Sequence, residues 1–281
     1  MTPKEEMRAY RPSECAQLAM ILEVCAWNKP GNVDRCHDYS DTWLEHFLAT
    51  MIFARHAFED AERAQRSIGE IFFDAVVASA RHGGGNTHFG AFLLLIPLIY
   101  GKGITGASSA VKKTTTHDAV LFYDAFSKIP VRVREKDDTY DIHDPKVYDR
   151  LRAEAQTMYT LMEYSSDHDI VAREWTNSFF LSNWTASQLM AASESTVTGR
   201  KCIPEVFLQL MAKEPDTFIA KKWGMQVAKD TCEKAKAVLA GKMSLHAFDI
   251  ECTSKGINPG SLADIMIAGL YIALMDGWRW E

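Results

Sequence analysis

Apolar residues recur every three or four positions through most of this 281-residue sequence and rarely alternate with polar ones. Residues 13–27 carry the pattern plainly. So do residues 41–65, whose stripe is Trp43, Phe47, Met51, Ala54 and Phe58. This spacing places apolar side chains on one face of an α-helix, whereas a half-buried strand requires alternation. The chain is therefore predicted to be all-α.

Turn-forming residues divide the helical pattern into segments. Ser67 and Glu70 have the spacing of a capping box at the start of one segment, which a glycine run at 83–85 ends. This segment is predicted to be a helix over residues 67–80. Further helices are expected at residues 87–100, 118–126, 146–164, 170–180, 185–193, 203–213, 217–239 and 261–278.

Three stretches lack a helical pattern. The Gly- and Ser-rich residues 101–110 are predicted to form a loop, residues 129–134 are a candidate extended segment, and residues 135–149 indicate an exposed connection. No composition shift or long linker divides the chain. We therefore predict a single domain over residues 1–281, built of roughly ten packed helices.

Acidic residues outnumber basic ones by 37 to 31, which gives a formal net charge of −6. Nucleic acids and anionic membranes attract proteins through an excess of Lys and Arg, so neither is an expected partner. The N-terminal residues lack the apolar core of a signal peptide, and the apolar runs are shorter than the roughly 20 residues that span a bilayer. We expect a cytoplasmic protein whose six cysteines are reduced thiols. A homodimer is compatible with the sequence but not dictated by it.

The first of three polar interruptions follows the first predicted helix. It reads KPGNVDR over Lys29 to Arg35 and continues through His37, Asp38 and Asp41. Cations, carboxylates and an imidazole in a loop between helices are typical of a functional site. An ordinary Pro-Gly turn with solvated charges would explain the spacing equally well.

The second interruption, GGGNTHFG over Gly83 to Gly90, leads into a strongly apolar helix. A glycine run at a helix N-terminus presents backbone N–H groups at the positive end of the helix dipole, which suits a phosphate. Asn86 or Thr87 could instead serve only as the N-cap. His88 taken alone is more often a structural histidine than a catalyst.

The third interruption reads NPGSLAD over Asn258 to Asp264. Ser261 and Asp264 have capping-box spacing, which would stabilise the last helix by about 1 kcal/mol without any ligand. The same amides and Ser261 could hold an anion, and Asp264 could hold a cation that bridges to it. The spacing leaves both interpretations open.

Two other patterns carry no function. Gly101, Gly103 and Gly106 have G-x-G-x-x-G order, but a dinucleotide fingerprint follows a strand, and here a helix precedes it. Cys36, His37 and His88 do not supply four ligands at a known zinc spacing.

Together and in this order, the interruptions resemble the motifs of the triphosphoribosyl-dephospho-CoA synthase family. The opening motif is similar to Glu23 followed by Lys29 to Arg35, the middle motif to Gly84 to Gly90, and the closing motif to Asn258 to Asp264. A fourth match, DTFIAKKWG over Asp216 to Gly224, resembles a D-[ST]-x-I-A-[RK]-K-x-G stretch. The matches extend from residue 23 to residue 264 and so cover most of the chain.

The resemblance implies an enzyme that displaces adenine from ATP and transfers the 5-triphosphoribosyl group to an alcohol. Loss of adenine builds oxocarbenium character at the ribose, which a carboxylate stabilises. Asp34, Asp38 or Asp41 is expected to do this. A base must take the acceptor proton and an acid must protonate adenine, and His37 and His88 are the candidates.

The triphosphate carries about four negative charges and requires Mg²⁺ with carboxylate ligands, together with basic side chains. Lys29 and Arg35 are assigned to the phosphates, and Asp34 and Asp264 to the metal. The other expected contacts to ATP or its phosphates are Gly84, Gly85, Asn86, Thr87, Asn258, Gly260 and Ser261.

The opening motif also departs from the family pattern. Asn28 stands where the family usually has proline, and CHDYSDT over Cys36 to Thr42 replaces the Ser-Gly-Ala-His stretch of the citrate-lyase branch. This version is closer to a divergent branch found beside methanopterin-dependent one-carbon metabolism. Two acceptors are therefore expected to compete, 3′-dephospho-CoA and a ribitol-bearing methanopterin precursor. The alternatives are a non-catalytic helical ATP-binding accessory protein and a Mg²⁺-dependent ribosyl hydrolase.

Overall fold

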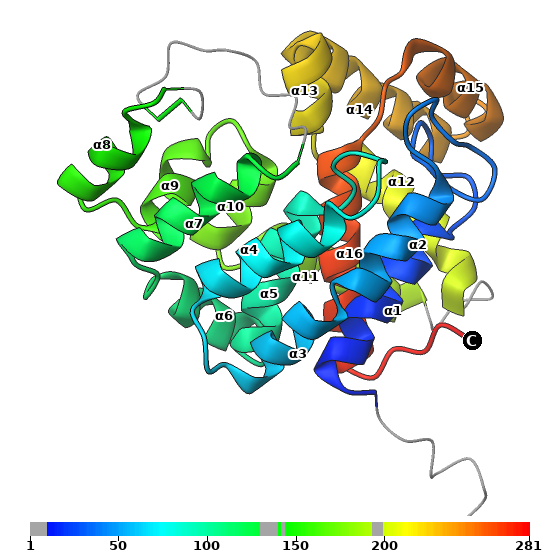
Figure 1. Ribbon diagram of the computed structural model, residues 1–281. Coiled ribbons are helices and arrows are strands. Elements are labelled where there is room, and N and C mark those ends of the chain that lie inside the picture. The colour runs from blue at the N-terminus through cyan, green and yellow to red at the C-terminus, as the bar shows by residue number, and fades with distance from the viewer. Residues whose placement is uncertain (1–9, 130–139, 142–143, 193–198) are drawn as a thin grey trace, which may run out of the picture.

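Helices make up the architecture of the protein (Figure 1). The computed structural model describes residues 10–129, 140–141, 144–192 and 199–281. These residues form sixteen α-helices and one short 3₁₀ helix, and none of them belongs to a β-strand. The all-α prediction is confirmed, whereas the predicted number of roughly ten helices was too low.

The helices follow one another without a sheet to order them. In chain order they are α1 (Pro12–Val24), α2 (Leu44–Phe53), α3 (Arg55–Arg63), α4 (Ile68–Ser79), α5 (Phe89–Tyr100), α6 (Ile104–Val111), α7 (Thr116–Phe126), α8 (Val147–Ala153), α9 (Met158–Ser165), α10 (Ile170–Thr176), α11 (Phe180–Ala192), the 3₁₀ helix (Gly199–Cys202), α12 (Ile203–Lys213), α13 (Thr217–Trp223), α14 (Met225–Leu239), α15 (Leu245–Lys255) and α16 (Gly260–Met275).

Three predicted helices are each two shorter ones. Residues 41–65 form α2 and α3, which meet at Ala54, and residues 146–164 form α8 and α9. Residues 217–239 form α13 and α14 on either side of Gly224, whose φ of +97° interrupts the helical backbone. The apolar spacing continues across these joints, so periodicity could not locate them.

Two helices were not predicted. Helix α6 occupies most of the stretch that was predicted as a loop. The glycines of this stretch allow two backbone segments to approach closely and do not make the stretch flexible. A Cβ at Gly106 would lie 1.9 Å from the carbonyl oxygen of Gly101, so only glycine lets α6 fold back on α5 at a bend of 107°. Helix α15 was missed because its sequence is largely polar. The predicted extended segment lies, after Ile129, outside the described residues.

Helix α16 runs through the middle of the molecule (orange to red in Figure 1) and contacts α1, α5, α10, α11, α12 and α13. Residues 265–274 are all buried, which explains why this helix is apolar on every side. Residues 91–99 of α5 are buried in the same way. The second and third polar interruptions immediately precede these two core helices, so the core fixes their positions.

The capping box predicted at the start of α4 is confirmed. The Ser67 Oγ atom accepts a hydrogen bond from the Glu70 N–H at 3.2 Å, and the Glu70 carboxylate accepts one from the Ser67 N–H at 2.9 Å. Both donors belong to the helix start, where no backbone acceptor is available. The sequence therefore located this helix start correctly.

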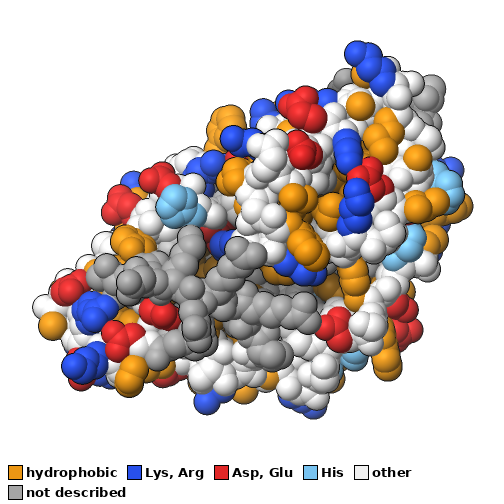
Figure 2. Space-filling model, turned by 90° about the horizontal axis from the view of Figure 1, so that it is seen from above, with side chains coloured by type: hydrophobic (Ala, Val, Ile, Leu, Met, Phe, Trp, Pro, Cys, Tyr) orange, Lys and Arg blue, Asp and Glu red, His pale blue; other side chains and the backbone are white. Residues whose placement is uncertain are grey.

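No single helix in the described parts of the chain is long and apolar enough to cross a membrane, and α5 and α6 meet that test only as a sharply bent pair. Figure 2 shows basic and acidic side chains interspersed over the described part of one face.

A proline inside α5 is compensated by a distant tryptophan. Pro97 has no N–H to donate to the carbonyl of Leu93, four residues earlier. The indole Nε1–H of buried Trp175 donates to that carbonyl instead, at 2.8 Å. This hydrogen bond links α10 to α5 and satisfies a buried acceptor that the helix itself cannot satisfy.

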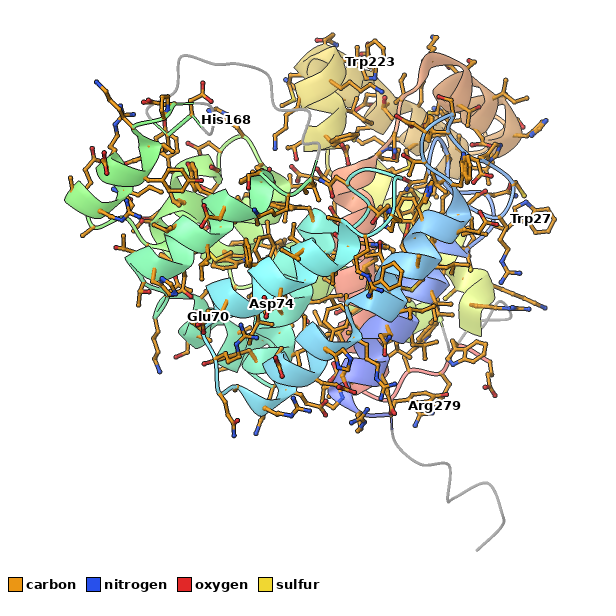
Figure 3. The ribbon with its side chains drawn as sticks, in the orientation of Figure 1. Trp27, Glu70, Asp74, His168, Trp223 and Arg279 are labelled. Carbon is orange, nitrogen blue, oxygen red and sulfur yellow. The ribbon has the colours of Figure 1, made fainter. Side chains whose placement is uncertain are left out.

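Trp175→Phe should lower the free energy of unfolding by about 1–3 kcal/mol, because it leaves the Leu93 carbonyl buried and unpaired. Pro97→Ala supplies the missing N–H, so the double variant should lose less stability than the sum of the single variants. Chemical denaturation measures both effects. Trp27→Phe is the control, since Trp27 is 63% exposed and points outward in Figure 3. A cost for Trp175→Phe that is unchanged by Pro97→Ala would contradict this explanation.

Candidate active site

The loop between α1 and α2 folds around a buried ion pair. Lys29 is only 1% exposed, and its Nζ atom pairs with the carboxylate of Glu23 in the last turn of α1. The same ammonium donates to the carbonyl of Val33 at 3.4 Å. Burial raises the pKa of Glu23, and the charge of Lys29 opposes that shift. A buried charge without a partner is strongly unfavourable, so each member of the pair holds the other in place.

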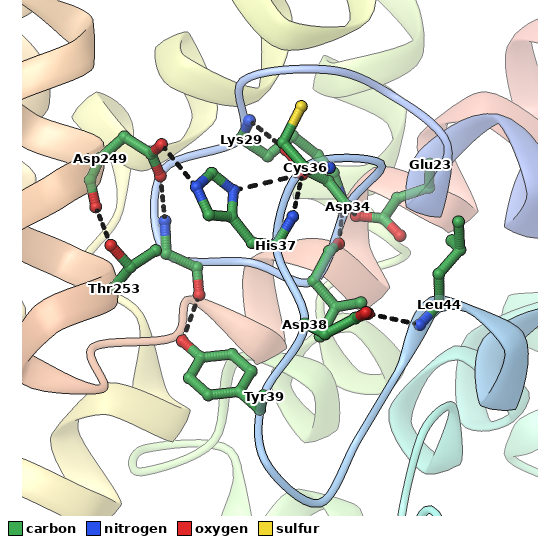
Figure 4. Close-up of polar contacts among 12 residues, drawn as sticks. Glu23, Lys29, Asp34, Cys36, His37, Asp38, Tyr39, Leu44, Asp249 and Thr253 are labelled. Atoms are coloured by element: carbon green, nitrogen blue, oxygen red, sulfur yellow. Dashed lines mark hydrogen bonds and ion pairs between the residues drawn. The ribbon is translucent and has the colours of Figure 1, made fainter.

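Asp34 organises the rest of the loop (Figure 4). Its Oδ1 atom accepts hydrogen bonds from the backbone N–H groups of Cys36 at 2.7 Å and His37 at 3.1 Å. Its Oδ2 atom accepts one from the N–H of Lys29 at 3.3 Å. The His37 ring lies between two carboxylates, with Nδ1 3.3 Å from Asp34 and Nε2 3.3 Å from Asp249. Both carboxylates therefore fix the orientation of the imidazole.

Contacts of Gly31 fasten this loop to the C-terminal part of the chain. Its N–H donates to Asp249 of α15 at 3.1 Å, and its carbonyl accepts a hydrogen bond from the Tyr39 hydroxyl at 2.6 Å. A Cβ at this position would lie 2.0 Å from the carbonyl oxygen of Ile257, and φ is +74°. Only glycine fits both requirements. The first interruption is thereby placed against the start of the third.

The second interruption packs against the same loop and against α2. The Thr42 hydroxyl donates to the carbonyl of Gly84 at 3.2 Å, and a Cβ at Gly84 would lie 2.2 Å from the His46 ring. The hydroxyl oxygens of Thr50 and Thr87 are 2.8 Å apart and share a hydrogen bond. Glycine at position 84 therefore permits a close approach to α2.

His88 is a buried imidazole with no protein partner. It is 2% exposed, and neither ring nitrogen makes a hydrogen bond within the described residues. Phe47 packs edge-on against the ring at 5.0 Å. Burial, followed by the charges of His82 and Lys29, lowers the pKa of His88 to about 3. The imidazole is therefore neutral at pH 7 and has one donor and one acceptor available.

Asp264 brings the third interruption to the second. A Cβ at Gly90 would lie 2.1 Å from the Asp264 Oδ2 atom, so the carboxylate lies directly against the first turn of α5. Burial raises the pKa of Asp264 well above its usual value, and the nearby charge of Glu23 raises it further, whereas the N–H of Ala91 lowers it. Asp264 is therefore close enough to Glu23, the partner of Lys29, for the charge of Glu23 to raise its pKa.

The capping-box interpretation of Ser261 and Asp264, one of the two that their spacing left open, does not hold. Helix α16 begins at Gly260 with Pro259 as its N-cap, so both residues lie inside the helix. The N–H of Leu262 donates instead to Asp216 at 2.8 Å. Asp216 also caps α13, and burial raises its pKa to about 6. A carboxylate from another helix thus performs the capping, which leaves Asp264 oriented towards α5.

The structure brings together candidates from all three interruptions. Lys29 and Asp34 are joined through the loop, Lys29 acts electrostatically on His88, and Asp264 contacts Gly90. Two buried amide atoms, Nδ2 of Asn32 and Oδ1 of Asn258, have no hydrogen-bond partner in the described parts of the chain. These polar groups are available to a ligand.

Other candidates lie at the periphery. Arg35, Asp38 and Asp41 are exposed, and the Asp38 carboxylate accepts the N–H of Leu44 at 2.8 Å, which caps α2. Asn86 is also exposed, and its Oδ1 atom accepts the N–H of Phe89 at 3.1 Å. The N-cap interpretation of Asn86 thus has a physical basis, although the amide remains at the surface of the second interruption.

Three important carboxylates received no role from the sequence. Glu23 and Asp216 belong to recognised motifs, yet neither motif reveals which atom the carboxylate contacts. Asp249 lies in α15, which was not predicted, and its partner Gly31 is 218 positions away. No local pattern could have identified that contact.

A search of curated proteins finds no match to this chain. The family model for ATP:dephospho-CoA triphosphoribosyl transferase matches residues 9–281. Among solved structures, the chain is similar to a protein from Archaeoglobus fulgidus that is provisionally named a triphosphoribosyl-dephospho-CoA synthase. The two share 26% identity with a TM-score of 0.68, over 83% of this chain and 100% of the other.

The resemblance drawn from four short motifs is therefore confirmed by a match over nearly the whole length. The fold of the A. fulgidus protein agrees with it independently. This chain belongs to the ATP:dephospho-CoA triphosphoribosyl transferase family, a family of transferases.

Proposed function

We propose that this protein transfers the 5-triphosphoribosyl group of ATP to an alcohol of 3′-dephospho-CoA and releases adenine. The bond between ribose C1 and adenine breaks, and a bond from C1 to the acceptor oxygen forms. The acceptor hydroxyl loses one proton and the leaving adenine gains one, so the reaction takes up and releases no net proton. The observation that carries the proposal is the convergence of the Lys29–Glu23 pair, His88 and Asp264, which come from three separate motifs. The two substrates in the family's name, ATP and dephospho-CoA, support the same reaction.

Lys29 and the backbone amides of the second interruption are proposed to hold the triphosphate. Gly84 to Thr87 precede the N-terminus of α5, where the positive end of the helix dipole favours an anion. The N–H of Gly84 already donates to Nδ1 of His82 at 3.1 Å, so the amides that follow it are the ones proposed to bind. Ser261, Gly260 and Asn258 border the same region from the start of α16. Arg35 is exposed and would reach the phosphates only from the rim of the site.

Mg²⁺ fits the acidic part of this cluster. Glu23 and Asp264 both have raised pKa values, chiefly because burial disfavours the charged carboxylate, and a cation beside them would favour that charged form. Mg²⁺ is bound in such sites through one or two carboxylates together with substrate phosphates. We propose Asp264, with Glu23 nearby, as the protein contribution. The ion would neutralise the charge of the triphosphate.

Asp34 is proposed to position the loop rather than to bind metal. Its oxygens already accept hydrogen bonds from three backbone N–H groups and face the His37 ring. Of the carboxylates considered for the oxocarbenium ion, Asp34 is buried beside Lys29, whereas Asp38 is exposed and caps α2. Asp41, the third carboxylate considered, is exposed as well, so Asp34 is the best placed of the three to stabilise positive charge.

His88 is proposed as the base that takes the acceptor proton. Its unpartnered nitrogens can accept a hydrogen bond from a hydroxyl group, and the negative charge of a bound triphosphate would raise its low pKa towards the range that a base requires. His37 has both ring nitrogens directed at carboxylates, so its proposed role is to hold the loop.

The first test is adenine release. The purified protein with ATP, Mg²⁺ and 3′-dephospho-CoA should release adenine in step with a product that is heavier by one triphosphoribosyl group, measured by chromatography and mass spectrometry. The divergent residues 36–42 make the ribitol-bearing methanopterin precursor the second acceptor to assay. Adenine released with a water-derived sugar product would indicate a hydrolase. ATP binding without adenine release with either acceptor would contradict the proposed transfer.

The second test separates the function of the buried ion pair from its contribution to stability. Lys29→Met should destabilise the protein by about 3–5 kcal/mol, because Glu23 is left buried without a partner. Adding Glu23→Gln removes that charge and should restore most of the stability in chemical denaturation. The double variant should nevertheless have kcat/KM for ATP at least a hundredfold below wild type. Near-normal activity in the stable double variant would show that the pair serves only the fold.

A further inference from the structure

A cavity is lined by residues from the end of α10, the start of α11 and the end of α12. Its volume of about 280 Å³ is near the lower end for ligand pockets, which begin at about 300 Å³. The lining residues are Arg173, Asn177, Phe180, Leu181, Lys213 and Glu214. Two cations and one carboxylate among them give the cavity a net positive charge, opposite in sign to the chain as a whole.

The two cations are held in different ways. The Arg173 guanidinium pairs with Glu214 at 2.7 Å, which orients it while using only part of its five N–H donors. The Lys213 ammonium lies 4.8 Å from the centre of the Trp184 ring, and no carboxylate in the described residues pairs with it. Glu214, which also lines the cavity, pairs with Arg173, so an anion entering the cavity would meet one ammonium that no carboxylate of the described residues pairs with.

An aromatic surface accompanies these charges. Phe180 is 60% exposed although it is a large apolar residue, and Trp184 follows one turn later on the same face of α11. An exposed phenylalanine gains nothing from hydrophobic burial in the free protein. It is available to pack against a flat ligand ring.

The backbone before α11 is strained in a way that presents Phe180. Ser178 and Phe179 have φ values of +64° and +55°, a left-handed conformation that side chains other than glycine rarely adopt. Glu174 stabilises the turn, since its carboxylate accepts the N–H groups of Leu181 at 3.0 Å and Ser182 at 2.8 Å. The chain therefore maintains an unfavourable turn that buries Phe179 and leaves its neighbour exposed.

Short connections join this cavity to the proposed phosphate cradle. Arg173 lies one helical turn after Ile170, whose N–H donates to the Thr217 hydroxyl at 3.2 Å. That hydroxyl donates to Ser261 at 3.1 Å. Lys213 and Glu214 end the helix that leads directly to Asp216. A ligand in the cavity would thus be close to the start of α16.

We propose that this cavity binds the diphosphate of the acceptor. Lys213 and Arg173 would pair with the negative charge of the diphosphate, and Phe180 and Trp184 would pack beside the adenine ring of the acceptor. The inference rests on the proposed function and narrows it to a phosphorylated acceptor. Dephospho-CoA carries a diphosphate, whereas the ribitol chain of the methanopterin precursor has no diphosphate for the two cations to bind. The aromatic side chains do not distinguish the two acceptors, because a pterin is an aromatic ring as well. The geometry thereby assigns the acceptor class.

The test is steady-state kinetics on substitutions in the cavity. Lys213→Glu and Phe180→Ala should each raise KM for dephospho-CoA at least tenfold and change KM for ATP less than twofold, and Lys213→Arg should be near wild type. The matched control is Lys229→Glu, on the exposed face of α14, which should change neither constant. If Lys213→Glu and Phe180→Ala are both active and have an unchanged KM for dephospho-CoA, the inference is overturned and the proposed function is left intact.

A direct binding measurement tests the cavity even if the protein releases no adenine. In that case the proposed transfer is contradicted, whereas the proposed binding site is still tested. Tryptophan fluorescence is titrated with dephospho-CoA and, in a separate arm, with inorganic diphosphate. Quenching that is lost in Trp184→Phe and weakened at least tenfold in Lys213→Glu supports the cavity as a diphosphate site. Inorganic diphosphate binding alone would limit the site to the phosphate groups and overturn the role of the aromatic rings. Quenching that both variants retain overturns the whole inference.

Discussion

The burial of the Lys29 ammonium group determines how the loop between α1 and α2 folds and which residues surround it. Lys29 can leave water only if a carboxylate compensates it, and Glu23 at the end of α1 does so. The loop must then close tightly over the pair, which Asp34 achieves by collecting the N–H groups of Lys29, Cys36 and His37. Hydrophobic residues of similar size would fill the same volume without this cost. The retained charges are better explained by a polyanionic ligand than by stability.

The same cluster unites segments that are far apart in the chain. Asp249 binds Gly31 across 218 positions, and Asp264 lies against Gly90. Because α5 and α16 are buried on nearly all sides, the two polar interruptions before them are held by the core and not by a flexible surface. The N–H groups and carboxylates proposed to receive ATP are therefore positioned before ATP binds, and preorganisation of this kind lowers the cost of stabilising a charged transition state.

Local sequence rules predicted what depends on local interactions. Periodicity identified most helices, and the Ser67–Glu70 capping box was placed correctly. What the sequence could not predict has tertiary causes. The glycines of 101–106 allow α6 to pack on α5, and Asp216 from another helix, not Ser261 and Asp264, caps α16. The motifs identified the loops of the candidate site, and the roles assigned to their residues stay predictions. Asp249, the partner of Gly31 and His37, could not be predicted, because its contacts bridge more than two hundred residues.

The central claim is that three distant loops form one pocket for a triphosphate and its metal ion. A crystal structure of the protein with ATP and Mg²⁺, in the absence of an acceptor, tests this most directly. The account predicts phosphate oxygens within hydrogen-bond distance of Lys29 and of the amides between Gly84 and Thr87, with the metal ion at Asp264. Nucleotide bound elsewhere, with Lys29 still paired only to Glu23, would contradict it.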